Sequence, residues 1–222
     1  MIPKKIHYCW FGGNEMSPLH KACMNTWKKY LPDYEIICWD EKNSPMEIPF
    51  IKYHYEKKNW AFVSDYVRLY ALYNHGGIYL DTDFEVLKNL DDLRDNDCFL
   101  GEEKKDRVTN GICGSIKGHL FYQEAISFME RRHTNKQEIL ISPEVCTYVY
   151  NDLKEKNLVE NIKVYTPDFF YPYNPFDANP AKHFLLADYI TDNTYAIHHW
   201  GHSWKQGLLK KIFKKIRYFI EG

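Results

Sequence analysis

The sequence predicts an α/β sandwich with a mainly parallel central sheet. Strand-like and helix-like segments alternate along the chain, and the polar motifs follow the carboxyl ends of the expected strands. With 222 residues, of which 45% are hydrophobic and 17% aromatic, the chain is long and apolar enough for a sizeable core. We expect one domain over residues 1–206, followed by a basic amphipathic helix over residues 207–222.

The individual elements follow from local signals. Ser17 and Pro18 form a typical helix start, because serine caps the first turn and proline fits its first position. Residues 40–58 are polar and are expected to be irregular. The other expected elements are strands over residues 4–10, 35–39, 78–80 and 98–101 and helices over residues 18–30, 59–74, 120–132 and 142–155.

The most informative segment is a helix that is followed by a glycine turn, a short apolar strand and two carboxylates. Gly76 and Gly77 end the helix, and residues 78–80 form the strand. Side chains at positions i and i+2 of a strand point the same way, so Asp81 and Asp83 are expected to converge at a solvent-exposed edge. Two hard oxygen donors in this arrangement suit Mg²⁺ or Mn²⁺ bound together with substrate phosphates.

The helix before this strand has two different faces. Ser64 and Arg68 fall on one side, and Asp65 lies on the flank. Taken alone, Asp65 and Arg68 are typical of a solvated i,i+3 ion pair worth roughly 0.3 kcal/mol. The opposite side is apolar and is expected to pack against the sheet; it consists of Phe62, Tyr66, Leu69, Tyr70 and Tyr73.

Three segments resemble glycosyltransferases that contain a DXD sugar-binding region. They are residues 2–13 (IPKKIHYCWFGG), residues 60–83, which include WAFVSDYVR and GGIYLDTD, and residues 196–204 (AIHHWGHSW). The resemblance is to the retaining group that includes yeast outer-chain mannosyltransferases, α-1,4-glycosyltransferases, bacterial capsule and lipopolysaccharide enzymes and clostridial glucosylating toxins. The segments occur in the family's order and bracket nearly the whole chain. The resemblance implies a GT-A fold, which is a Rossmann-type sandwich.

The resemblance also implies roles for individual residues. Asp83 matches the aspartate that binds the metal directly, and Asp81 matches the one that contacts the ribose or the metal's water shell. Asp65 and Arg68 match residues that hold the donor sugar and its phosphate, which completes an expected catalytic set. Trp10 matches an aromatic residue that stacks on the nucleobase. The other donor-binding positions that the resemblance implies are Gly12, Ser64, Tyr79, Ser203 and Trp204.

A histidine near the end of the chain is the implied third metal ligand. His198 and His199 both match the family's position, and strand alternation places them on opposite faces, so only one can point inward. Imidazole is an acceptable ligand for Mn²⁺. We choose His198 because it directly follows Ala196 and Ile197, with His199 and His202 as alternatives.

The implied reaction is sugar transfer from a nucleotide sugar, foremost a UDP-sugar, to a glycan acceptor. The implied pathway is capsular polysaccharide, O-antigen or lipopolysaccharide synthesis, and the implied cofactor is Mn²⁺ or Mg²⁺. The metal and Arg68 would stabilise the charge that grows on the leaving diphosphate. No residue stands out as a nucleophile, so we expect retention to proceed by displacement on the same face, with the leaving phosphate assisting the acceptor hydroxyl.

Two segments in the middle of the chain have two interpretations each. The small residues of 110–115 (NGICGS) allow close approach to a ligand, or form a plain turn between strands. The aromatic residues of 165–173 (YTPDFFYPY) form an acceptor platform, or a loop that packs on the core. The helix that begins at Pro143 resembles the family's segment near the acceptor.

Charge, cysteine content and hydropathy exclude several classes of protein. The net charge of −1 gives no indication of nucleic-acid binding. The six cysteines are scattered without a C-x-x-C pair, which favours reduced core thiols over a zinc site. No signal peptide and no apolar run long enough to span a membrane are recognisable, so we expect a cytoplasmic protein.

Residues 207–222 (GLLKKIFKKIRYFIEG) carry a signal of their own. Five basic residues and one acidic residue give this segment a charge of +4, and its apolar residues fall on the opposite arc of a helix. Such a helix is typical of peripheral attachment to an anionic membrane, here the inner face of the cell membrane. The alternative is an ordinary terminal helix that packs on the domain. The membrane interpretation suits a lipid-linked acceptor.

Two further functions remain open at this point. The first is a non-catalytic carbohydrate- or nucleotide-sugar-binding protein on the same fold, against which the intact Asp81, Asp83, Asp65 and Arg68 argue. The second is a secreted toxin-type transferase that acts on protein, against which the short chain argues.

Overall fold

A six-stranded sheet forms the centre of the computed structural model, which describes residues 1–175 and 186–201. The strand order is β2-β1-β3-β6-β5-β7. Only β6 runs against the other five strands, because it pairs antiparallel with both β3 and β5. The predicted α/β class with a mainly parallel sheet is therefore confirmed. The strands are β1 (Lys5–Cys9), β2 (Glu35–Trp39), β3 (Gly77–Leu80), β5 (Cys98–Lys104), β6 (Arg107–Ser115) and β7 (Ile162–Tyr165).

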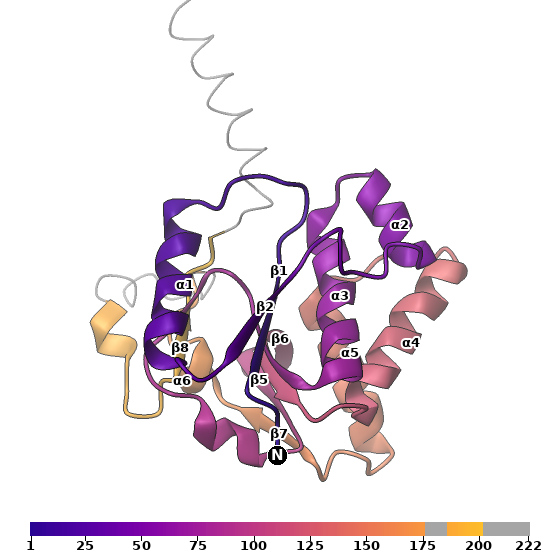
Figure 1. Ribbon diagram of the computed structural model, residues 1–222. Helices are drawn as coiled ribbons and strands as arrows, with labels where there is room; N and C mark the ends of the chain where they lie inside the picture. Colours follow the sequence, from indigo (N-terminus) through magenta and orange to yellow (C-terminus); the bar gives the residue numbers. More distant parts are fainter. Residues whose placement is uncertain (176–185, 202–222) are drawn as a thin grey trace, which may run out of the picture.

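Different elements cover the two faces of this sheet, each over its own apolar core (Figure 1). One face carries α2 (Pro49–Glu56), α3 (Trp60–His75), α4 (Leu120–Thr134) and α5 (Ser142–Glu155). The other face carries α1 (Pro18–Tyr30), α6 (Pro167–Phe170) and a small sheet of β4 (Phe84–Val86) and β8 (Ala196–His198). Two short 3₁₀ helices, Asp91–Asp95 and Leu186–Tyr189, lie between these elements in the sequence.

Helix α1 begins where the sequence predicts and anchors β4. Ser17 caps it by accepting a hydrogen bond from the His20 amide, and Pro18 is its first residue. Trp27 is fully buried, and its Nε1 donates to the Phe84 carbonyl at 2.7 Å. The Thr26 hydroxyl accepts from the Val86 amide at 2.9 Å. Helix α1 therefore fixes the strand that directly follows the two aspartates.

The predicted orientation of α3 is wrong for Tyr66, although Tyr70 meets Trp39 of β2 edge-on at 6.0 Å as expected. Tyr66, expected against the sheet, stacks on Phe50 of α2 and donates to Glu130 of α4. The polar side faces the sheet instead, where Arg68 meets Asp81 and Asn110. Helix α3 is covered on both sides, so amphipathicity alone does not decide which side meets the sheet.

Three other segments differ from their predicted structure. Residues 49–56 form α2 within the stretch expected to be irregular, and Pro49 at its first position is the signal for this helix. Residues 110–115 are part of the central strand β6 rather than a turn, because tertiary packing overrides the weak strand propensity of glycine and asparagine. Of the two interpretations of residues 165–173, the structure favours packing on the core, because Phe170 and Tyr171 are buried.

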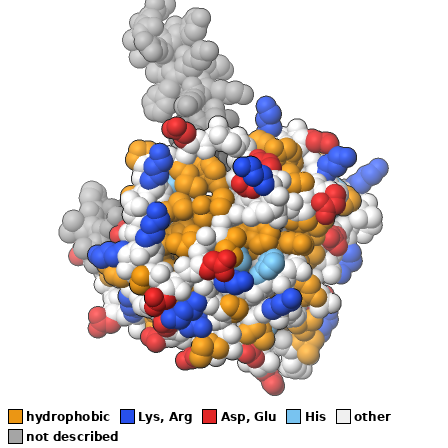
Figure 2. Space-filling view, viewed as in Figure 1, with side chains coloured by type: hydrophobic (Ala, Val, Ile, Leu, Met, Phe, Trp, Pro, Cys, Tyr) orange, Lys and Arg blue, Asp and Glu red, His pale blue; other side chains and the backbone are white. Residues whose placement is uncertain are grey.

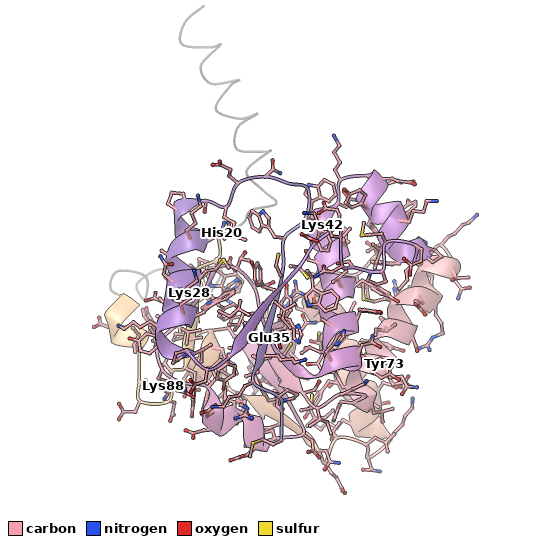
Figure 3. All side chains as sticks on the ribbon, viewed as in Figure 1. His20, Lys28, Glu35, Lys42, Tyr73 and Lys88 are labelled. Atoms are coloured by element: carbon pink, nitrogen blue, oxygen red, sulfur yellow. The ribbon has the colours of Figure 1, made fainter. Side chains whose placement is uncertain are left out.

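The carboxyl ends of the parallel strands define one edge of the sheet. In Figure 3, Glu35 marks the start of β2 and Lys42 lies beyond its end, toward the same upper edge as His20 of α1. Because β1 and β3 run parallel to β2, residues 10–13 and 81–83 follow strand ends at this edge. All six cysteines are free. Within the described ranges, no helix is both long and apolar enough to cross a membrane.

Candidate active site

Arg68 forms ion pairs with two of the predicted site residues, Asp65 and Asp81. Its Nη2 lies 3.0 Å from both Asp65 Oδ1 and Asp81 Oδ1, and its Nη1 donates to Asp81 Oδ2 at 3.2 Å. Nη1 also donates to the Asn110 carbonyl at 3.1 Å. The Asp65–Arg68 pair is therefore part of a buried network, and the simple interpretation as a solvated ion pair is wrong.

The charges in this network shift one another's pKa values. Burial raises the pKa of Asp65 to about 6, although Arg68 and hydrogen bonds from Ser142 oppose the rise. Burial also raises the pKa of Asp81, against the effect of Arg68. Burial would lower the pKa of Arg68, but the charges of Asp81, Tyr79 and Asp65 together outweigh it and hold that pKa well above its usual range.

Asp83 faces a different set of partners, which come from the other end of the described chain. His198 Nε2 lies 3.2 Å from Asp83 Oδ1, and the Gly201 amide donates to Asp83 Oδ2 at 2.8 Å. Burial would raise the pKa of Asp83, but the charge of His198 and these hydrogen bonds outweigh it and lower the pKa. Trp200 adopts a left-handed backbone conformation, with φ of 51°, in the residue before Gly201.

The two neighbouring histidines point to different carboxylates. Strand β8 pairs antiparallel with β4, with Phe84 opposite His198. His199 Nε2 lies 2.7 Å from Glu85 Oε2, whereas the His198 ring stacks on Phe84 beside Asp83. The structure thus brings His198, the predicted ligand, to Asp83, while His202 lies outside the described residues.

The geometry of the Asp81–Asp83 segment differs from the prediction. The two residues lie in a turn, which the Phe84 amide closes by donating to the Asp81 carbonyl at 3.0 Å. Strand alternation therefore does not align the two side chains, so that expectation is wrong. Asp81 is instead directed to Arg68 by its own contacts, and Asp83 to His198.

The predicted donor-binding residues lie around this centre with contacts of their own. Trp10 is half-buried; its ring meets His20 edge-on at 5.2 Å, and its Nε1 donates to the Asn14 carbonyl at 2.6 Å. The Gly12 amide donates to Glu41 Oε1 at 2.8 Å. The Ser64 carbonyl accepts a long contact from Cys9 Sγ. Tyr79 is buried under the Arg68 guanidinium and donates from its hydroxyl to Asp81 Oδ1 at 3.1 Å. Ser203 and Trp204 lie outside the described residues.

Sequence reasoning assigned no role to two residues that belong to this network. Asn110 is buried, contacts Arg68 through Oδ1 at 3.4 Å, and accepts a hydrogen bond from the Ser142 hydroxyl on α5. Its Nδ2 has no hydrogen-bond partner among the described residues. The Asn110-Gly111 dipeptide was visible as a small-residue stretch, but nothing in it distinguished an interior strand from a turn. Ser142 was visible only as a helix start.

The residues at this edge fit a divalent cation. Two ligands of an octahedral ion at about 2.1 Å lie about 3 Å apart when adjacent, which the 3.2 Å between His198 Nε2 and Asp83 Oδ1 matches. The described ranges contain no closed cluster of three His, Cys, Asp or Glu side chains. Asp83 and His198 would thus hold an ion that keeps open positions, as Mg²⁺ does when it binds substrate phosphates. Asp81 lies on the same turn, but its carboxylate is paired with Arg68 in this arrangement.

Comparisons with known proteins give the sequence relatives and the shared fold of this chain. The family described as "Glycosyltransferase sugar-binding region containing DXD motif" matches residues 17–100. Inositol phosphoceramide mannosyltransferase 3 of Schizosaccharomyces pombe is 27% identical over 135 residues, which are 59% of this chain and 38% of that protein. An uncharacterized glycosyltransferase of Acanthamoeba polyphaga mimivirus is 26% identical over 241 residues, which are 99% of this chain and 91% of that protein.

The solved structures show a shared fold. The PaToxG glycosyltransferase superposes with a TM-score of 0.58 at 18% sequence identity, over 71% of this chain and 72% of that one. It and related structures are GT-A glycosyltransferases, so the predicted GT-A fold is confirmed. The chain spans well under half of the yeast relative but nine-tenths of the viral one. The family match thus covers residues 17–100, and the fold of the chain is that of GT-A glycosyltransferases.

Proposed function

We propose that this protein transfers a sugar from a nucleotide sugar, foremost a UDP-sugar, to a glycan acceptor with the help of Mn²⁺ or Mg²⁺. The main support for the proposal is that Asp83 contacts His198 and accepts a hydrogen bond from Gly201, next to the Arg68–Asp81 pair. A strand-end motif alone occurs by chance, whereas this arrangement brings together residues 118 positions apart.

Charge balance supports a role for a cation. Among the described residues of this centre, Asp65, Asp81 and Asp83 are three carboxylates, and they face the guanidinium of Arg68 and the imidazole of His198. A diphosphate would add further negative charge to this group, so its binding needs a compensating cation. When bound, a divalent cation supplies Lewis-acid stabilisation of the leaving diphosphate.

The chain's own residues would divide the remaining work. Asp65 and Asp81 orient the guanidinium of Arg68, which places a fixed positive charge beside the leaving group. Asn110 would offer its unpartnered Nδ2 to an oxygen of the donor sugar. Trp10 would stack on the nucleobase. Retention of the anomeric configuration follows from displacement on the same face, in which a leaving phosphate oxygen accepts the proton of the acceptor hydroxyl.

A lipid-linked acceptor at the inner face of the cell membrane is the substrate class we favour. The basic, apolar sequence of residues 207–222 suits an anionic surface. This segment begins six residues after Gly201, and six residues extend over about 20 Å at most. Attachment there would hold the Asp83 site close to the bilayer. Capsular polysaccharide, O-antigen and lipopolysaccharide synthesis all use acceptors at such a surface.

Nucleic acid is not a partner in this proposal. On the face seen in Figure 2, Lys and Arg side chains alternate with Asp and Glu around an apolar centre, rather than forming one basic field. The net charge of −1 agrees with this mixed surface.

The competing function is a non-catalytic binding protein that keeps the same fold. Incubating the protein with a panel of UDP- and GDP-sugars, first with Mn²⁺ and then with EDTA, distinguishes the transferase from the non-catalytic binding protein. We expect one donor to release nucleotide with Mn²⁺ only, and Asp83→Ala to abolish this release. The matched control is Asp33→Ala, because Asp33 is exposed and precedes β2, at the opposite edge of the sheet.

Each outcome of this assay has a separate meaning. Release that persists in Asp83→Ala, or in EDTA, would contradict the assigned metal site. Binding of a nucleotide sugar without any release, even with acceptor extracts present, would favour the non-catalytic function. Equal loss in Asp83→Ala and Asp33→Ala would indicate damage to the fold, which a thermal melt of both variants detects.

A further inference from the structure

A buried tyrosine hydroxyl without an acceptor for its proton lies next to the proposed site. Tyr171 follows α6 and is 3% exposed. Its hydroxyl has no acceptor for its own proton within the described ranges, and the Ile112 amide nearby can only donate to it. Burying a hydroxyl without a partner is unfavourable, so a protein gains by losing it or by giving it a ligand. The position of this hydroxyl indicates which ligand.

Gly111 brings the Tyr171 hydroxyl close to Asp81. A methyl group added at Gly111 would lie 2.9 Å from Tyr171 Oη and 3.0 Å from Asp81 Oδ2. The two oxygens therefore lie within about 6 Å of each other. One hydrogen-bonded oxygen atom, at about 2.8 Å from each, spans such a gap. A phenol is protonated at neutral pH, so the Tyr171 hydroxyl can donate to such an oxygen.

The ring of Tyr171 lies equally close to the other half of the site. It meets the His198 ring edge-on, with centroids 5.6 Å apart, and the Phe84 ring at 5.4 Å. Tyr171 thus lies between the Arg68–Asp81 pair and the Asp83–His198 pair: its ring meets His198, and its hydroxyl lies within about 6 Å of Asp81 Oδ2. No other side chain in the described ranges that has a buried hydroxyl without an acceptor lies beside both pairs.

We propose that the Tyr171 hydroxyl is a ligand-binding group of this site, an inference that rests on the proposed function. It donates a hydrogen bond to an oxygen atom that sits between it and Asp81. The oxygen belongs either to the bound donor or to a water in the hydration shell of the cation. Aspartate accepts and tyrosine donates, so the pair recognises a hydroxyl group or a water, which can do both.

The test compares Tyr171→Phe with Tyr122→Phe in the full-length chain. Tyr122 is also fully buried, but its hydroxyl faces the thiols of Cys98 and Cys113 in the core, away from the proposed site. Calorimetry measures the binding of UDP, and of the donor that the panel selects, across a Mn²⁺ titration. Thermal melts without ligand measure stability.

We expect Tyr171→Phe to melt at or above the wild-type temperature and to bind its ligand about three- to tenfold more weakly. A weaker response to Mn²⁺ at fixed UDP assigns the oxygen to the cation's water. Unchanged UDP binding with weaker binding of the sugar donor assigns it to the sugar. Tyr122→Phe should change neither affinity.

Three results would overturn the inference. The first is wild-type affinity of Tyr171→Phe for both UDP with Mn²⁺ and the donor. The second is an equal loss in Tyr122→Phe. The third is a lower melting temperature for Tyr171→Phe without ligand, because the hydroxyl would then have a structural partner. If the wild-type protein binds no nucleotide at all, the proposed function itself has failed and this inference fails with it.

Discussion

Replacing Gly111 with alanine should damage the site more than the fold. The added methyl group would lie 2.9 Å from Tyr171 Oη, 3.0 Å from Asp81 Oδ2 and 3.1 Å from Phe84 Cε2. An ordinary contact is about 3.5 Å, so each neighbour must move by about 0.5 Å. Overpacking of this kind costs about 1–3 kcal/mol. A reacting group misplaced by about 1 Å costs roughly 100-fold in rate, so a shift of about 0.5 Å at Asp81 should cost about tenfold in kcat/KM.

The assay compares donor turnover and thermal melts of Gly111→Ala with those of Gly114→Ala. Gly114 lies on the same strand, and a methyl group there would clash with the Phe99 ring rather than with Asp81. We expect both variants to melt at lower temperature, but only Gly111→Ala to lose turnover beyond the loss of folded protein. Wild-type kcat/KM in folded Gly111→Ala would refute the reasoning that Gly111 sets the position of Asp81.

Three further predictions concern pH and the C-terminal segment. Burial and the charges of His75 and Lys5 lower the pKa of His7 to about 4, although its hydrogen bond to Gly76 opposes this shift. This contribution to the free energy of unfolding is therefore fully present above pH 6.5, and it falls by about 3 kcal/mol toward pH 4. Urea unfolding at several pH values should show this fall in the free energy of unfolding, and the fall should be smaller in His7→Gln. An equal pH dependence in the wild type and in the variant would contradict the prediction. Because the pKa of Asp65 is raised to about 6, kcat/KM should rise between pH 5 and 7 as Asp65 ionises and pairs with Arg68, and Asp65→Asn should remove that step. Removing residues 207–222 should release the protein from anionic vesicles in a sedimentation assay, whereas unchanged binding would favour a packed terminal helix.

The sequence predicted those elements whose signals are local. Ser17 and Pro18 placed the start of α1, and the apolar run of residues 35–39 placed β2, because caps and short buried strands depend on neighbouring residues. Strands β4 and β8 have three residues each and pair across more than a hundred positions, so no local pattern identifies them. The side of α3 that meets the sheet also depends on partners distant in sequence, namely Asp81 and Asn110.

The residues of the candidate site likewise include some that the sequence predicts and some that it does not. Asp81 and Asp83 could be named from their place after an apolar strand, whereas Asp65 and Arg68 could be named only from the family resemblance, because alone they are typical of a surface ion pair. Asn110 could not, because an asparagine beside glycine is equally typical of a turn. Sequence spacing also could not decide which of His198, His199 and His202 is the metal ligand. Only the pairing of β8 with β4 brings His198, rather than His199, to Asp83.

The hydrogen bond from the Gly201 amide to Asp83 has a consequence for biosynthesis. During translation the segment that carries both aspartates emerges long before residues 196–201, which complete the surroundings of Asp83. A nascent or truncated chain that ends before β8 retains Arg68 and Asp81 but lacks the imidazole and the amide that hold Asp83. Contacts so distant along the chain form late, because the closure of long loops costs entropy. Nucleotide-sugar chemistry would therefore begin only after residues 196–201 have left the ribosome and paired with the Asp83 segment.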